Sequence, residues 1–132
     1  MTELDVALKS HFDSMDDIHI VILFGSRASG NATEKSDVDV AVYFSDPLTS
    51  ERKMRLITEL SNLCNAEIDL LDLHDTGALI FRQVLSKGRF LVNRTPAVYE
   101  KLLKRLVYDE ADFLPLLRRT LRERANRFID GQ

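Results

Sequence analysis

The sequence predicts an α/β fold, also describable as α+β, with a small mixed β-sheet flanked by helices and a helical extension at the C-terminus. Two observations lead to this class. Short runs rich in Val, Ile, Leu and Phe alternate with segments whose apolar residues recur at helical spacing. The 132 residues are 45% apolar and 30% charged, which is typical of one globular domain, so we expect a single domain over residues 1–132.

The first third of the chain predicts a helix and two strands. Apolar residues at helical spacing place the helix over residues 3–15. The apolar run 19–24 ends at Gly25 and reads as a buried strand, because β-branched residues fit a pleated surface. Residues 25–36 are polar and predict a loop, and 37–44 alternate as a second strand.

A second helix and a third strand follow. Thr49 or Ser50 can cap a helix whose apolar stripe predicts an end near Asn65. Residues 67–73 predict the third strand.

The last third of the chain is mostly helical. Asp75 or Thr76 is expected to open a helix that Gly88 terminates, and 89–93 predict a short, peripheral strand. Helical spacing then continues from about 96 to 129, and Pro115 should divide or kink this region.

Composition excludes several classes of protein. No apolar stretch approaches the roughly 20 residues of a membrane-spanning helix, and the acidic N-terminus is unlike a signal peptide. The lone cysteine, Cys64, forms no internal disulfide, so a cytoplasmic location is expected. A net charge of −3 argues against nucleic acid as the main direct partner.

The chemistry concentrates around Gly25-Ser26 and Asp37-Val38-Asp39. A glycine after a strand lets backbone N–H groups approach a ligand closely, and the serine hydroxyl adds a donor, which suits phosphate oxygens. Two aspartates at i and i+2 of a strand share a face, about 7 Å apart. They can share divalent cations such as Mg²⁺, which prefers hard oxygen ligands and phosphate oxygens.

A third carboxylate on the strand 67–73 would complete such a site. Asp69 is favoured, because Glu67 shares its face but lies at the strand start and Asp72 faces the other way. Arg27, beside the phosphate loop, either binds a γ-phosphate or is an ordinary surface arginine.

Gly25-Ser26, ten further residues and then Asp37-x-Asp39 resemble the signature of the DNA polymerase β-type nucleotidyltransferase superfamily. The short chain resembles its minimal (MNT) members, which are antitoxins of HEPN/MNT toxin–antitoxin pairs. The resemblance covers residues of about 18–95, which would be the core. The C-terminal helices, 97–129, would pack on it or dock a partner.

The resemblance implies a function and a set of roles. Gly25 and Ser26, with Arg27 beside them, would bind the nucleotide's phosphates. Asp37 and Asp39 would bind two Mg²⁺ ions, and Asp69 would be either a metal ligand or the general base beside the attacking hydroxyl. ATP would be the substrate, and AMP would pass to a tyrosine of a partner HEPN ribonuclease toxin, with release of pyrophosphate and formation of a hetero-oligomer.

Two alternatives remain open at the level of sequence. The chain could be a non-catalytic antitoxin that neutralises its partner by binding. It could also be a small-molecule nucleotidyltransferase of the aminoglycoside-modifying kind, although such enzymes carry a further helical domain for which 132 residues leave little room.

Overall fold

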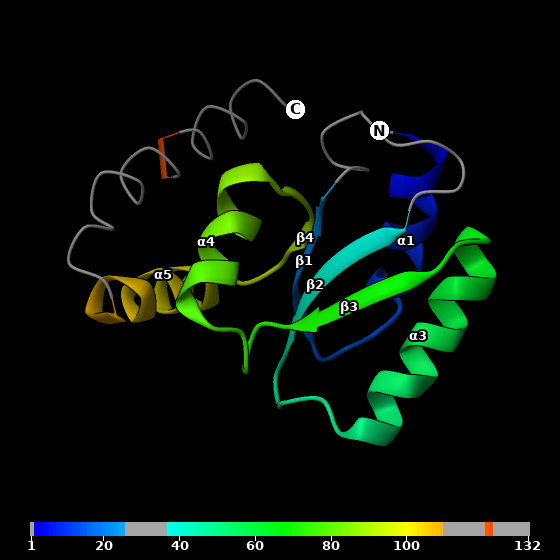
Figure 1. Ribbon diagram of the computed structural model, residues 1–132, viewed down its shortest axis with the longest axis horizontal. Coiled ribbons are helices and arrows are strands. Elements are labelled where there is room, and N and C mark those ends of the chain that lie inside the picture. Colours follow the sequence, from blue (N-terminus) through cyan, green and yellow to red (C-terminus); the bar gives the residue numbers. More distant parts are fainter. Residues whose placement is uncertain (1, 26–36, 110–120, 123–132) are drawn as a thin grey trace.

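The computed structural model describes residues 2–25, 37–109 and 121–122, and its elements follow the order expected from the sequence (Figure 1). They are α1 (Glu3–Asp13), β1 (Ile18–Phe24), β2 (Val38–Phe44), α3 (Ser50–Cys64), β3 (Ile68–Asp72), α4 (Ala78–Lys87), β4 (Arg89–Asn93) and α5 (Pro96–Asp109). Apart from Gly25, the expected loop 25–36 lies outside the described residues.

The four strands form one mixed sheet in the order β3-β2-β1-β4. β1 is antiparallel to both β2 and β4, whereas β2 and β3 run parallel. β1 and β2 therefore occupy the centre of the sheet, and β4 lies at one edge, as its short and peripheral character predicted. The mixed sheet expected from the sequence is confirmed.

Each face of the sheet is covered by a pair of helices (Figure 1). α1 and α3 pack on one face, through buried side chains such as Phe12 and Leu60. α4 and α5 pack on the other, through Phe81 and Leu102. Because alternate side chains of a strand point to opposite faces, the centre of β2 is buried on both sides. Only its N-terminal end keeps a polar, partly exposed face.

Helix ends follow local chemistry. Of the two expected caps of α3, Thr49 fills the role by accepting a hydrogen bond from the Arg52 N–H. The helix ends at Asn65, as expected, and this residue is in the left-handed conformation. The expected cap of α4 was wrong. Its N-cap is Gly77, because the Thr76 hydroxyl donates instead to the Asp72 carbonyl oxygen and the Asp75 N–H closes a turn onto the same carbonyl.

The C-terminal region is described as far as α5 and at residues 121–122, which are helical. Leu102 and Leu103 of α5 are buried against α4 and the sheet, as the apolar spacing predicted. The break expected at Pro115 lies outside the described residues. In the part of the chain that the structure describes, no helix has the length and apolarity needed to cross a membrane.

Gly88 ends α4 for a steric reason. Its backbone is extended, with φ −79°, so a left-handed conformation is not what requires glycine. A Cβ at this position would instead collide with the Val84 carbonyl oxygen and the Ile22 side chain. The turn from α4 into β4 therefore lies directly against β1.

Gly88→Ala is expected to lower the free energy of unfolding by about 1–3 kcal/mol, the usual cost of forcing extra atoms into a packed interior. Gly77→Ala is the comparison variant, since nothing lies within 4 Å of a Cβ there, and it should cost less, because it loses only the preference for glycine over alanine at a helix N-cap. Urea denaturation of both variants measures the difference. Equal stabilities would contradict the steric account of Gly88.

Candidate functional site

Strand pairing brings four of the residues singled out in the sequence to one end of the sheet. Asp39 of β2 is in register with Phe24 of β1 on one side and with Asp69 of β3 on the other. Gly25 follows Phe24 directly, and Asp37 precedes β2. Residues separated by more than 40 positions along the chain thus meet around the Asp39 carboxylate.

Gly25 is pressed against that carboxylate. Its φ is +72°, a left-handed value that glycine adopts without the penalty paid by other residues. A Cβ at this position would also overlap the Asp39 Oδ2 atom. The backbone at the end of β1 can therefore approach the Asp39 side chain only because residue 25 has none. The role of this turn in binding phosphate stays a prediction.

The carboxylates of this site oppose one another electrostatically. The pKa of Asp39 is raised above its ordinary value, first because the side chain is partly buried. The Asp69 carboxyl group raises that pKa further, through its charge and through a side-chain hydrogen bond, and the Asp37 charge adds to the effect. Asp37 and Asp69 themselves are exposed. A cation held between these groups would relieve the repulsion.

The carboxylates of the site fit Mg²⁺, but they do not form a complete set of ligands for it. Carboxylate oxygens are the ligands that this ion prefers. Among the described residues, however, no three His, Cys, Asp or Glu side chains are gathered closely enough to hold a metal ion by themselves. Mg²⁺ is commonly bound by one or two carboxylates together with substrate phosphates and water. The Asp39–Asp69 pair fits that mode better than a closed site built from protein alone.

The structure places some of the other residues considered in the sequence and does not describe the rest. Ser26 and Arg27 lie outside the described residues. Asp72 is on the opposite face from Asp69 and is buried, where its carboxylate accepts hydrogen bonds from the N–H groups of Leu48 and His74. That arrangement gives Asp72 a structural task in joining two loops. Glu67 precedes β3 and its carbonyl oxygen accepts a bond from the Val38 N–H.

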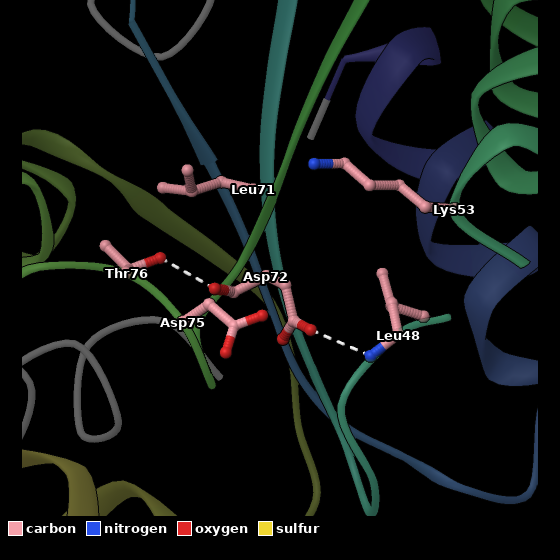
Figure 2. Close-up of a pocket in the computed structure, with 6 residues that line it drawn as sticks. All are labelled: Leu48, Lys53, Leu71, Asp72, Asp75 and Thr76. Carbon is pink, nitrogen blue, oxygen red and sulfur yellow. Dashed lines mark hydrogen bonds between the residues drawn. The ribbon is translucent and has the colours of Figure 1, made fainter. Parts of the chain in front are cut away.

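A cleft of about 140 Å³ at the C-terminal end of β3 was not anticipated from the sequence (Figure 2). It is lined by Leu48, Lys53, Leu71, Asp72, Asp75 and Thr76. The sequence offered Asp75 only as a helix cap, and nothing in the spacing pairs it with residues of α3. The cleft begins two residues beyond Asp69 on the same strand.

Comparison with known proteins identifies the family. The sequence model of the family described as polymerase beta, nucleotidyltransferase matches residues 7–97, which is more than half of the chain. The chain belongs to the polymerase beta nucleotidyltransferase family. The match confirms the resemblance carried by Gly25, Asp37 and Asp39, and it includes every strand of the sheet.

One similar protein is named a protein adenylyltransferase. The chain is 29% identical over 79 residues to the protein adenylyltransferase MntA of Shewanella oneidensis, a match covering 60% of this chain and 57% of the relative. The matched region is thus less than two thirds of that relative's length.

Solved structures show the same fold. A chain of a toxin–antitoxin crystal structure with AMP-PNP superposes with a TM-score of 0.69 at 21% identity, over 89% of this chain and 98% of that one. A chain from the complex of a tri-AMPylated Shewanella oneidensis HEPN toxin with its MNT antitoxin superposes with a TM-score of 0.62, also at 21% identity, over 89% of this chain and 95% of that one. The nucleotidyltransferase fold expected from the sequence is confirmed.

Replacing Asp39 should stabilise this nucleotidyltransferase fold in the absence of Mg²⁺. A carboxyl group whose pKa is raised by folding binds protons more tightly in the folded state, so the stability of the wild type falls as pH rises above the unfolded value of about 3.9. Asp39→Asn has no carboxyl group at this position, so its stability does not fall with pH for this reason. Its midpoint of thermal unfolding at pH 7 should exceed that of the wild type, and the excess should shrink towards pH 4.

Added Mg²⁺ is the second readout of that experiment. It should raise the melting temperature of the wild type and leave Asp39→Asn unchanged. Asp16→Asn, an exposed acid outside the site, serves as the control and should behave as the wild type in both respects. A variant at Asp39 that melts below the wild type at pH 7 without Mg²⁺ would contradict the repulsion described above.

Proposed function

We propose that this chain is a Mg²⁺-dependent nucleotidyltransferase that transfers AMP from ATP to a tyrosine of a HEPN-family toxin and thereby acts as its antitoxin. The observation that carries the proposal is the register that sets Asp39 between the Gly25 turn and Asp69. Family membership supports the reaction class. The similar proteins support the nucleotide and the partner, since one is called a protein adenylyltransferase and a chain of the same fold comes from the complex of an AMPylated HEPN toxin with an MNT antitoxin.

In this proposal the nucleotide's phosphates lie against the turn that follows β1. Gly25 and Ser26 would donate hydrogen bonds to the β- and γ-phosphate oxygens, and Arg27 would add a positive charge at the γ-phosphate. Asp37, Asp39 and Asp69 would hold the Mg²⁺ ions. When bound, Mg²⁺ neutralises triphosphate charge and lowers the pKa of a hydroxyl next to it.

The transfer itself is a single displacement at the α-phosphorus of ATP. The tyrosine oxygen forms a bond to the α-phosphorus, the bond from that phosphorus to the bridging oxygen breaks, and pyrophosphate leaves with that oxygen. Asp69, the most exposed carboxylate on β3, would receive the tyrosine proton. The partly buried Asp39 would hold its position through the sheet and act as a metal ligand alone.

The partner completes the acceptor half of the site in this proposal. The described residues supply a phosphate turn and carboxylates at the end of an open sheet, and the acceptor tyrosine would come from the HEPN protein. Residues 1–132 would act as one nucleotidyltransferase domain, with the helices of 97–129 packing on the core or contacting the partner. An ATP-dependent reaction on a ribonuclease toxin would take place in the cytoplasm.

Intact mass spectrometry of a co-expressed HEPN partner tests the proposal. After incubation with this chain, ATP and Mg²⁺, adenylate masses should appear on the partner, and peptide mapping should locate them on tyrosine. Asp37→Ala and Asp39→Ala should abolish the addition. Asp69→Asn should slow it by about 10²–10⁴-fold, the usual contribution of a general base.

Asp16→Asn is the matched control and should transfer AMP at the rate of the wild type. A partner that is fully neutralised without any added mass, in the wild type and in Asp39→Ala alike, would identify the chain as an antitoxin that acts by binding. Addition of AMP to an aminoglycoside in place of the partner would identify the small-molecule alternative.

A further inference from the structure

The cleft at the end of β3 has two chemically different ends. Figure 2 shows the carboxyl groups of Asp72 and Asp75 turned into one end and the Lys53 side chain extending across the other. The side chains of Leu48 and Leu71 supply apolar surface between them. Its volume of about 140 Å³ is on the scale of a single amino-acid side chain.

Hydrogen bonds fix the walls of the cleft. Asp72 accepts bonds from the N–H groups of Leu48 and His74, at 2.8 Å and 3.0 Å, and so ties the loop before α3 to the loop after β3. The Thr76 hydroxyl donates to the Asp72 carbonyl oxygen. From α5, the Arg105 guanidinium donates to the Leu73 and Thr76 carbonyl oxygens. The walls of the cleft are therefore held in place before any ligand binds.

Two charges in the cleft are left for a ligand. Within the described part of the chain, neither the Asp75 carboxylate nor the Lys53 ammonium group takes part in a hydrogen bond or an ion pair. Two carboxylates and one ammonium group give the lining a net charge of −1. The adjacent Asp69 adds a further negative charge. This balance favours a cationic ligand at the carboxylate end, whose alkyl portion would lie on the two leucines.

The cleft lies next to Asp69, where the residue that accepts AMP would lie in the proposed reaction. Asp69 and Leu71 are on the same face of β3, about 7 Å apart, as any two residues i and i+2 of a strand are. No described strand pairs with the outer edge of β3. An extended peptide lying along that edge with its acceptor side chain at Asp69 would therefore bring the side chain two positions away to the cleft.

We propose that this cleft binds a basic side chain of the acceptor protein, two residues from the residue that receives AMP, with the Asp75 carboxylate as its principal partner. The cleft would then select the acceptor sequence, whereas the residues around Asp39 carry out the transfer. The inference rests on the proposed function for the identity of the acceptor. The binding itself is measurable without any transfer of AMP.

Nuclear magnetic resonance of the ¹⁵N-labelled full chain tests the binding directly, with acetyl-Arg-Gly-Tyr-amide and acetyl-Gln-Gly-Tyr-amide as matched probes. The arginine peptide should shift the amide signals of residues 71–76, and the glutamine peptide should not. Asp75→Asn should weaken binding of the arginine peptide by about three- to fivefold, the size expected for one exposed charge pair. Lys53→Ala should strengthen it, because it removes a repelling charge.

Asp75→Asn should weaken binding of the arginine peptide and Lys53→Ala should strengthen it. Damage to the fold would weaken binding in both variants, so the two outcomes can be told apart. Asp16→Asn and Arg55→Ala, exposed charges outside the cleft, should leave the binding unchanged. Signals that respond equally to both peptides, or to neither, would overturn the inference, as would an Asp75→Asn chain that binds as the wild type does.

Kinetics with a HEPN partner supply an independent readout. Asp75→Asn should raise the KM for the partner three- to fivefold by the same charge-pair reasoning, with kcat and the KM for ATP unchanged. Absence of AMP transfer by the wild-type chain would refute the proposed function and leave the peptide measurement standing. Transfer with the same partner KM in both chains would refute the role of the cleft alone.

Discussion

The pairing of β2 with a neighbour on each side is the constraint on which the candidate site depends. In that register Asp39 has the end of β1 on one side and Asp69 on the other. A slip of one residue would turn Asp39 into the core and turn Val38 or Val40 outward, because successive side chains of a strand face opposite sides. The buried valines of β2 therefore fix the position of the Asp39 carboxylate. Packing of the core in this way sets the geometry of the candidate site.

That geometry is electrostatically unfavourable for the protein alone. The pKa of Asp39 is raised by burial and by two neighbouring carboxyl groups, and Gly25 lacks the side chain that would separate the backbone from them. Apolar burial elsewhere in the sheet offsets this cost: β1 is buried along most of its length, and helices cover both faces of the sheet. A site that repels itself is suited to recruit a cation together with a polyphosphate.

The edge strand β3 links the candidate site around Asp39 to the cleft beyond it. Its N-terminal half carries Asp69, and its C-terminal half carries Leu71 and Asp72. The two halves are held differently, since pairing with β2 positions Asp69 and loop hydrogen bonds position the cleft. One short strand thus connects the candidate carboxylates with the residues that line the cleft.

The sequence by itself determined the elements and the local chemistry of this protein, because hydrophobic periodicity, caps and turn residues act over a few positions. It predicted the four strands, a helix cap at Thr49 or Ser50 and the alternation that sets Asp69 apart from Asp72. Only the tertiary structure decided the rest. The α4 cap at Gly77 is the local exception, since it follows from a hydrogen bond between Thr76 and Asp72, four residues apart, that the sequence pattern did not predict. The register of Asp39 with Asp69, the contact of Gly25 with Asp39 and the cleft between Lys53 and Asp75 join residues more than ten positions apart, and chain folding alone brings such residues together.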